Sequence, residues 1–337
     1  KVKWINCAFL KRFLGNRGMR WAARMIRSRY RPDLCFVFFH DLPLLLMQEF
    51  SEETPTVIWM EELGAKTDPR VAGGALLDYV RQARLICLST PDLVTGYRDL
   101  GIENSTFLMS GFSPAYHRPS RWSLSGRYDR DLAFIGGPGY MGDRPAFLSR
   151  LAEHHDLEIF GLKDSWLPSL RNFSNLRVKG EVRPRGYARV CARSRIVVGL
   201  NQSHDHWLYF SNRIYLTLAC RGFHLTHYVP GMEEVFGDGV HLAWFKDFDE
   251  CLDKISYYLS HERERHRIAQ AGSDLVLREH RYEHRVADIL AILRKEKAPF
   301  CPVGHLHEAG LAKGAIAFPT KDQVGSSSKR ASGSLSS

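Results

Sequence analysis

The sequence predicts an α/β protein in which two Rossmann-like, parallel-sheet domains are followed by C-terminal helices. Short runs of β-branched and aromatic residues alternate with helix-length amphipathic segments, which is the pattern of βαβ units. The alternation stops at a polar stretch and then restarts, so it indicates two such domains. The chain has 337 residues, which is long enough for two cores of ordinary size.

The first domain is expected over residues 1–115. Its expected strands are the runs DLCFVFF, TPTVIWM, ARLICLS and NSTFLM, with helices at 71–82 and 91–100 between strands. A start that is truncated relative to a complete domain is left open. Residues 116–130, rich in Pro, Ser and Arg, show no hydrophobic period and are expected to be a linker.

The second domain is expected over residues 131–297. Its expected strands are DLAFIGG, DLEIFG, NLRVKG, RIVVGLN, GFHLTHY and VHLAWF. From residue 247 onward, apolar residues recur at i, i+3, i+4 and i+7, which predicts a run of helices. Residues 298–337 shift to Gly, Pro and Ser and predict a disordered tail.

The composition excludes several classes of protein. The longest apolar runs are interrupted well before the roughly 20 residues of a membrane span. The seven cysteines lie far apart without a C-x-x-C pair, and no leader-like start is evident, so a cytoplasmic protein with reduced thiols is expected. Basic residues occur along the whole chain without a nucleic-acid-binding motif. The formal charge of +10 therefore favours anionic small substrates or peripheral contact with the inner face of a membrane, and not nucleic acid.

A glycine-rich turn separates the first strand of the second domain from its first helix. The turn begins with Gly136 and Gly137, and from Gly137 it matches G-x-G-x-x-G. The helix is expected to open near Asp143, with Arg144 in its first turn. Such a turn suits a dinucleotide or a diphosphate, because backbone N–H groups and a helix N-terminus both attract phosphate. A dinucleotide also needs an acidic residue at the end of the next strand, and neither Glu158 nor Asp164 is well placed for it.

A second polar cluster follows the run RIVVGLN. Asn201 ends that run, and Ser211 or Asn212 is expected to cap the next helix, which aims free N–H groups outward. Arg213, beside them, is a bidentate phosphate donor if it faces the site and a surface arginine if it does not.

A third polar cluster follows the run GFHLTHY. There Gly231 is expected to turn the chain into another helix, with Glu233 and Glu234 in its first turn. Carboxylates are favoured at that position by the helix dipole alone, and they could also accept the hydroxyls of a ribose.

The ordered elements NRIY, GFHLTHY, GMEEVF, CLDKISYYL and ERHRIAQAG resemble the C-terminal region of the CgeB-like, group 1 (GT4-type) glycosyltransferases. Upstream, TPTVIWMEELG and the stretch from LICLSTPDL to RDLAFIGG resemble the acceptor-side domain and the passage between domains. The resemblance covers most of residues 31–294. It implies a GT-B fold, in which two Rossmann-like domains face a cleft and the second holds the nucleotide sugar.

The resemblance also implies roles for residues. Arg144 and Arg213 take the places of diphosphate-binding groups, and Glu233 or Glu234 that of the ribose ligand. The other donor-side candidates are Gly136, Gly137, Asn201, Ser211, Asn212 and Gly231. Glu61, Glu62 and His40, at strand ends of the first domain, are candidates for acceptor binding or general-base catalysis.

The sequence departs from the family pattern at Leu208 and Leu216, where many relatives carry glutamates. A catalytically degenerate GT-B protein that binds a glycan or a partner is therefore an alternative, and a nicotinamide-dependent enzyme is another. The H-x-x-E-H pattern starting at His280 and the HDH stretch at 204–206 are alternative metal sites that the resemblance does not support.

The leading expectation is a metal-independent hexosyltransferase-like enzyme that needs no cofactor. It would move a sugar from a nucleotide diphosphate to an acceptor hydroxyl, in surface glycan or polysaccharide biosynthesis. In such chemistry the diphosphate departs as an anion, so cations and N–H groups aimed at it stabilise the transition state.

Overall fold

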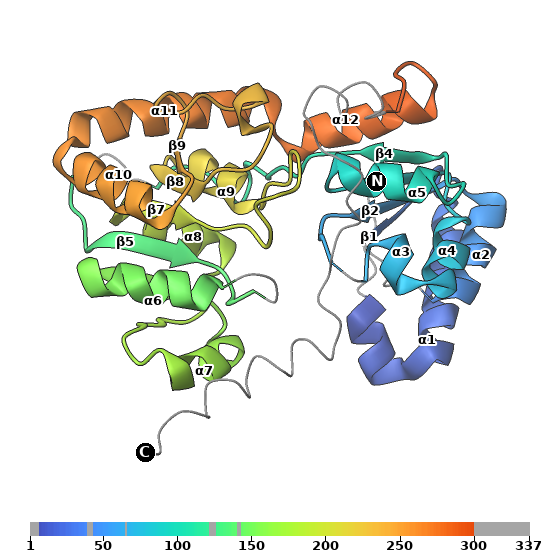
Figure 1. Ribbon diagram of the computed structural model, residues 1–337. Coiled ribbons are helices and arrows are strands. Elements are labelled where there is room, and N and C mark those ends of the chain that lie inside the picture. The colour runs from blue at the N-terminus through green and yellow to red at the C-terminus, as the bar shows by residue number, and fades with distance from the viewer. Residues whose placement is uncertain (1–6, 39–42, 65, 121–125, 140–142, 300–337) are drawn as a thin grey trace, which may run out of the picture. The chain divides into compact units, whose positions relative to one another are not determined.

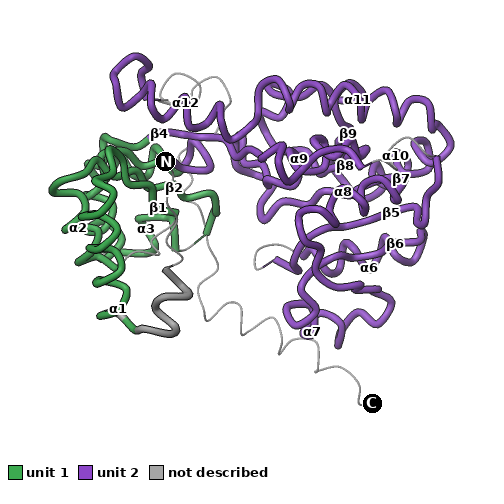
Figure 2. The backbone as a smooth tube through the Cα atoms, turned by 180° about the vertical axis from the view of Figure 1, so that it is seen from behind, with its two compact units in different colours: residues 1–86, 93–105, 300–337 green, residues 87–92, 106–299 purple. Residues whose placement is uncertain are grey.

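The computed structural model describes residues 7–38, 43–64, 66–120, 126–139 and 143–299. The contacts divide the described chain into two compact units (Figure 2). Unit 1 holds the residues up to 86 together with 93–105, and unit 2 holds 87–92 and 106–299. The boundary expected at 116–130 stays a prediction. The tail expected from residue 298 lies, from residue 300 on, outside the described residues.

Unit 1 is built on a sheet whose strands follow chain order, β1-β2-β3-β4 (Figure 1). The strands are β1 (Cys35–Phe38), β2 (Thr56–Met60), β3 (Leu85–Leu88) and β4 (Ser105–Phe107), and β1 pairs with β2 in parallel. All residues of β2 and β3 are buried, as expected for strands covered on both faces. The helices are α1 (Cys7–Tyr30), α2 (Leu44–Glu53), α3 (Pro69–Ala72), α4 (Gly74–Val80) and α5 (Pro91–Arg98), and the first two residues of α5 belong to unit 2.

The helix expected over 71–82 is instead two short helices, α3 and α4, separated at Gly73. Gly73 has φ 77°, a left-handed conformation that glycine adopts without a steric penalty and that interrupts a right-handed helix. Asp68 caps α3, and its carboxylate accepts a hydrogen bond from the Arg70 backbone N–H at 2.9 Å. A local cap therefore begins α3, and a glycine ends it.

Unit 2 contains a five-stranded sheet in the order β6-β5-β7-β8-β9, in which each neighbouring pair is parallel. Its strands are β5 (Arg130–Ile135), β6 (Leu157–Phe160), β7 (Ser194–Gly199), β8 (His224–His227) and β9 (Ala243–Phe245). Its helices are α6 (Arg144–His154), α7 (Lys163–Asn172), α8 (Pro184–Ala192), α9 (Arg213–Ala219), α10 (Phe248–Ser260), α11 (Glu262–Glu279) and α12 (Tyr282–Leu293).

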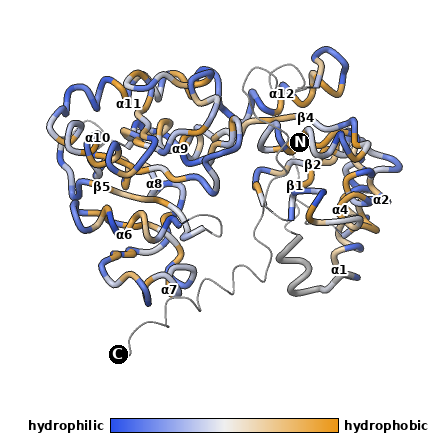
Figure 3. Tube along the Cα trace, in the orientation of Figure 1, coloured by the Kyte–Doolittle hydropathy of each residue, from blue (hydrophilic) through white to orange (hydrophobic). Residues whose placement is uncertain are grey.

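The core of unit 2 lies on both faces of this sheet. Leu132 and Phe134 of β5 pack into a cluster with residues of α6 and α10, whereas Ala133 and Ile135 pack with residues of α8. Alternate residues of a strand point to opposite faces, so a continuous apolar run serves both layers. Figure 3 shows the hydrophobic residues gathered on strands such as β5, with hydrophilic ones frequent on α11. The parallel α/β class predicted from the sequence is confirmed.

One expected strand is absent from the described part of unit 2. The run NLRVKG forms only an isolated bridge, in which the Ile159 N–H donates to the Arg177 carbonyl and the Lys179 N–H donates to the Ile159 carbonyl. The run is thus pinned to the edge of β6 at one point. No helix among the described residues combines the length and apolar character needed to cross a membrane.

Candidate functional site

The predicted donor-side residues gather at the carboxyl ends of β5 and β7. The chain leaves β5 for β6 on one side and later continues from β7 to β8 on the other. The point between β5 and β7 is therefore where the direction of the connections reverses. In open parallel sheets, ligands bind in the crevice outside the strand ends at this switch point. Gly136 and Gly137 follow β5 there, and Leu200 and Asn201 follow β7.

Arg144, the first residue of α6, ties the two loops of the switch point together. Its guanidinium donates from Nη1 to the Gly137 carbonyl at 2.8 Å, and from Nη2 to the carbonyls of Leu200 and Asn201 at 3.1 and 2.9 Å. The residue is only 5% exposed. Hydrogen bonds from a charged donor are the strong ones, so Arg144 holds the glycine turn against the β7 loop.

Arg213, the first residue of α9, reaches the same point from the other side. Its Nη2 donates to the Leu200 carbonyl at 2.6 Å, and its Nη1 and Nε make no hydrogen bond with a described residue. Burial lowers the pKa of this guanidinium, and no carboxylate of the described chain pairs with it. A partly buried cation without a counter-ion is costly, so the arrangement favours binding of an anion at the free donors.

The glycine turn leaves room for these two arginines. A side chain on Gly136 would place its Cβ 2.8 Å from Arg213 Nη1, and the φ of Gly136, 153°, also suits glycine. Each guanidinium Cζ lies 5.5 Å from the ring centroid of Phe134, on β5. A buried aromatic ring thus supports two cations at the end of the sheet.

Histidines that remain neutral line the same end of the sheet. Burial, and secondly the neighbouring His227 and Arg144, lower the pKa of His204 to about 3. The His204 ring stacks on His227 with centroids 3.8 Å apart and accepts a hydrogen bond from the Asn201 N–H. Burial, and secondly the charge of Arg213, likewise lower the pKa of His224 to about 3. The site is therefore electropositive through its arginines alone.

Asn201 and the start of α9 are joined directly. The Asn201 carboxamide oxygen accepts from the Ser211 N–H at 2.8 Å, and Ser211 Oγ accepts from the Arg213 N–H at 3.4 Å. Asn212 occupies the cap position, but its side chain makes no capping hydrogen bond. Of the two predicted caps, only Ser211 contacts a helical N–H.

The helix expected around Glu233 and Glu234 is a single 3-10 turn, Met232–Glu234. Gly231 enters it with φ 81°, and glycines at 237 and 239 end the turn before a helix can form. Both carboxylates are exposed and held by aromatic donors. The Tyr228 hydroxyl donates to Glu233 at 3.0 Å, and Trp207 Nε1 donates to Glu234 at 3.1 Å.

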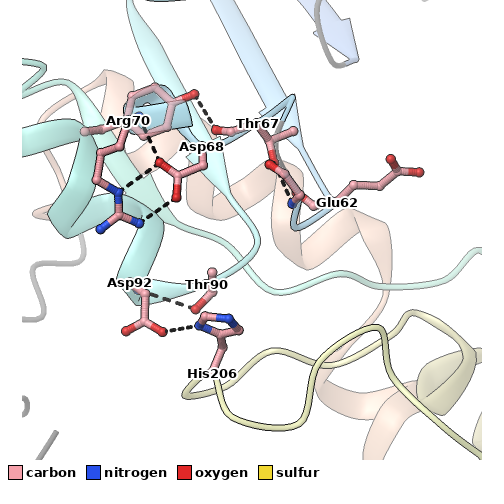
Figure 4. Close-up of polar contacts among 9 residues, drawn as sticks. Glu62, Thr67, Asp68, Arg70, Thr90, Asp92 and His206 are labelled. Carbon is pink, nitrogen blue, oxygen red and sulfur yellow. Dashed lines mark hydrogen bonds and ion pairs between the residues drawn. The ribbon is translucent and has the colours of Figure 1, made fainter. Parts of the chain in front are cut away.

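An aspartate–histidine pair that the sequence did not indicate lies in unit 2. The Asp92 carboxylate is 2.8 Å from His206 Nδ1 (Figure 4). Nearby, Thr90 Oγ1 donates to the Trp207 carbonyl at 3.1 Å. His204 and His206 thus have different partners, so the HDH stretch is not arranged as a chelate. Its histidines were the signal in the sequence, but Asp92 lies 114 positions away from His206.

Glu61 and Glu62 directly follow the carboxyl end of β2, as expected, whereas His40 lies outside the described residues. Glu61 is partly buried and Glu62 exposed. Thr67 closes the loop by donating to the Glu62 carbonyl, and the Tyr97 hydroxyl donates to the Thr67 carbonyl at 2.9 Å. Figure 4 shows the Glu62 carboxylate extending away from this network. The loop is therefore braced while its acidic side chain stays accessible.

The side chains of the alternative zinc and dinucleotide motifs contact other residues of the protein. His280 Nδ1 lies 2.6 Å from an Arg285 guanidinium nitrogen, and His284 contacts Arg281. Glu158, weighed as a ribose ligand of a dinucleotide, pairs with Arg130 at 2.6 Å and with Lys179 at 3.0 Å. Across the described ranges, no group of three or more His, Cys, Asp or Glu side chains is arranged to hold a metal ion.

The two leucines at the departures from the family pattern are packed. Leu208 is 4% exposed, has φ 56° and donates its N–H to the Pro230 carbonyl at 2.8 Å. Leu216 packs against the apolar cluster that contains Tyr187 and Cys220. Neither position therefore offers a carboxylate, whereas Glu233 and Glu234, which follow β8, carry one each.

The paired parallel-sheet units, with a cationic switch point in the second, define a GT-B architecture. A sucrose-phosphate synthase from Thermosynechococcus elongatus has the same fold, with a TM-score of 0.61 at 11% identity over 87% of this chain and 80% of that one. Anabaena HepE in complex with UDP and glucose gives a TM-score of 0.59 at 12% identity, over 87% and 84%. A glycosyltransferase from Rickettsia africae gives 0.56 at 11% identity, over 82% and 79%.

The sequence of unit 2 also matches a known protein family. Residues 144–291 match the model of the glycosyl transferase-like family, a span that runs from Arg144 at the switch point into α12. Among curated proteins, no sequence matches this chain. The family match thus concerns most of unit 2, and the structural neighbours show the GT-B fold.

Proposed function

We propose that the protein transfers a sugar from a nucleotide diphosphate to an acceptor hydroxyl. The observation that carries the proposal is Arg213, a guanidinium whose pKa is lowered by burial and whose Nη1 and Nε have no partner in the described chain. It lies at the switch point of a parallel sheet, beside Gly136. A diphosphate would supply the missing counter-charge. The crystal structures of HepE with UDP and with UDP-glucose are consistent with this ligand class.

Arg213 would act mainly on the leaving group. The bond from the sugar to the diphosphate breaks as the acceptor oxygen attacks, and the electron pair goes to the diphosphate oxygen. The proton of the acceptor hydroxyl would pass to a base, for which Glu61 and Glu62 are the candidates. A guanidinium aimed at that oxygen stabilises the developing charge. Arg144, engaged with three carbonyls, would position the glycine turn so that the Gly137 region approaches the phosphates. Since two cations stand at this point, we propose that no metal ion is required.

The remaining roles follow the geometry of the loops. Glu233 or Glu234 would accept the ribose hydroxyls, with Tyr228 and Trp207 holding the carboxylates in place. Asn201 and Ser211 would fix the start of α9. Glu61 and Glu62 are proposed for acceptor binding or general-base work, and His40 stays a candidate. We assign the protein to the CgeB-like branch because of the elements NRIY to ERHRIAQAG. The proposed role in surface glycan synthesis rests on the same resemblance.

The proposal is tested by thermal shift with UDP, GDP, dTDP and CMP sugars, followed by donor hydrolysis measurements. A stabilising shift with one nucleotide sugar and release of its nucleotide are expected. Arg213→Met should abolish most of the shift, whereas Arg171→Met, at an exposed position of α7, should preserve it. Failure of all the nucleotides to bind would overturn the proposal. Protection by NAD or NADP alone would favour a nicotinamide enzyme instead.

A second candidate is a GT-B protein that binds without catalysis. The observation in its favour is that Leu208 is buried and Leu216 packs, partly buried, against an apolar cluster, so that neither position offers a carboxylate. Under this alternative the nucleotide sugar binds, and Arg213→Met weakens that binding, but neither hydrolysis nor transfer to any acceptor occurs. Turnover that Arg213→Met reduces would exclude it.

A further inference from the structure

The excess positive charge of the protein is concentrated at one end of the sequence. Residues 1–31 contain ten Lys and Arg and no Asp or Glu, whereas the whole chain contains 47 basic and 37 acidic residues. The remaining 306 residues therefore balance at 37 of each sign. Basic residues occur along the whole chain, but beyond residue 31 an equal number of acidic residues balances them. Most of this basic segment is α1.

Helix α1 has two different faces over its described side chains. Met19, Ala22 and Ala23 are buried, with Ile26 partly buried, which gives the i, i+3, i+4, i+7 spacing of a helix packed on its unit. The opposite face carries Arg17, Trp21, Arg24, Met25 and Ser28, all exposed. Trp21 is 64% exposed and Met25 is 44% exposed. Two large apolar side chains one turn apart thus stand in solvent among arginines.

Only part of the charge on α1 is neutralised within unit 1. Arg24 forms a bidentate pair with Glu49 of α2, and Arg27 pairs with Glu53 at 3.2 Å. Arg17 and Arg29 are exposed and form no ion pair with a described residue. The two glutamates therefore fix the helix to α2, and the outer arginines remain available to a partner.

We propose that this outer face of α1 docks on a membrane surface rich in anionic lipids. A helix with a basic polar face and interspersed Trp and Met lies in the plane of the interface, with its apolar side chains among the acyl chain ends and its cations at the headgroup phosphates. Guanidinium groups bind phosphate oxygens in a bidentate manner. Trp21 is suited to the headgroup region, because its ring is apolar and its N–H is polar.

The exposed apolar residues favour a membrane over a nucleic acid. A phosphate backbone attracts arginines but gains little from Trp21 and Met25 on one helical face without a base-stacking platform. An anionic bilayer contacts both sets of side chains at once. This inference stands apart from the proposed sugar transfer, because it concerns unit 1 alone and needs no nucleotide.

The test is flotation of the full chain with vesicles of phosphatidylcholine, with and without phosphatidylglycerol. Binding is expected only with phosphatidylglycerol, and it should weaken as salt is added. The double variant Arg17→Gln/Arg29→Gln should lower the vesicle affinity by about 25-fold, at about fivefold per basic residue near an anionic surface. Trp21→Ala should lower it without changing the salt dependence.

The matched control removes two exposed arginines from unit 2, Arg171→Gln/Arg263→Gln, and makes the same change in net charge. It should bind vesicles as the unaltered protein does. Equal loss in the control and in the α1 variant would overturn the proposal, as would equal binding to vesicles without phosphatidylglycerol. Binding of a DNA duplex that depends on Arg17 and Arg29, with no vesicle binding, would assign the face to nucleic acid instead.

Discussion

Replacing Arg213 with methionine isolates the contribution of one guanidinium to nucleotide binding. Methionine keeps the length and apolar stem of the side chain but removes its charge and all of its donors. A hydrogen bond to a charged group contributes about 1.5–3 kcal/mol. The loss of one such bond to a diphosphate should therefore weaken binding by about 10- to 150-fold.

The same substitution should scarcely change the stability of the fold. Arg213 gives its only described side-chain hydrogen bond to the Leu200 carbonyl, which also accepts from Arg144 Nη2 at 3.1 Å. That carbonyl stays satisfied when Arg213 is removed. The substitution also deletes a buried charge without a counter-ion, which offsets the lost contact with Phe134. We expect the free energy of unfolding to change by less than about 1 kcal/mol.

The assay is isothermal titration calorimetry with UDP and with uridine, beside urea unfolding of both proteins. The affinity for UDP should fall in Arg213→Met, while any affinity for uridine, which lacks phosphate, should not. Arg213→Lys should fall between the two, because it keeps the charge but not the fork of donors. If another nucleotide binds best in the thermal screen, its diphosphate and nucleoside replace this pair.

A structural arginine would give the opposite result. In that case Arg213→Met would lower the free energy of unfolding by more than about 2 kcal/mol and leave the affinity for UDP within about twofold of the unaltered protein. That outcome would refute the assignment of the anion to the switch point, whatever the activity of the variant.

Four further outcomes follow from the same contacts. Arg144→Met should destabilise the fold by about 2–4 kcal/mol in urea unfolding, because the carbonyls it joins lose a charged donor; an unchanged midpoint would contradict this. Gly136→Ala should weaken UDP binding by about tenfold in calorimetry, since the new Cβ would press on the anion-binding guanidinium, and full affinity would show that the guanidinium can shift freely. The His224 ring stays neutral in the folded state down to about pH 3 but takes up a proton below about pH 6.5 when unfolded, so its contribution to stability is lost as the pH falls. Between pH 7 and about pH 5, the free energy of unfolding of His224→Leu should therefore fall by about 2 kcal/mol less than that of the unaltered protein. Equal falls would show that the His224 ring can take up its proton in the folded state. Glu233→Gln should weaken binding of UDP but not of its 2′,3′-dideoxy analogue, and equal weakening of both would separate this carboxylate from the ribose.

The fold could be predicted because its signals are local. Strands β2, β3 and β5 contain continuous apolar runs, and such runs are typical of parallel strands buried on both faces. The errors arose where one residue overrides the pattern. Gly73 divides a helix that its neighbours favour, and Gly231 with the following glycines reduces another to a single turn. The run NLRVKG has strand composition but meets β6 at one bridge only.

The candidate site could be predicted in part, because the carboxyl ends of parallel strands meet at one edge of a sheet. This is why Gly136, Asn201 and Arg213 could be expected together from three separate stretches. The sequence could not show that Arg144 has its donors bonded to carbonyls while Arg213 keeps free ones in the described structure, since only the folded loops bring those carbonyls into reach. The pair of Asp92 and His206 was equally hidden, because no spacing rule joins residues so far apart in the chain.

The difference between the two arginines also bears on the missing glutamates. In the described structure Leu216 packs into the apolar cluster beside Tyr187, whose hydroxyl contacts Thr217 and the Arg213 carbonyl. A carboxylate at 216 would place a negative charge next to that apolar packing and within the same helix as the Arg213 guanidinium. With leucine there, the guanidinium keeps no internal counter-ion among the described residues. Under the proposed function, the departure from the family pattern would remove a competitor for the anion and would leave the ribose to the exposed Glu233 and Glu234. On that proposal, the affinity for the diphosphate, more than for the ribose, should decide whether the site works.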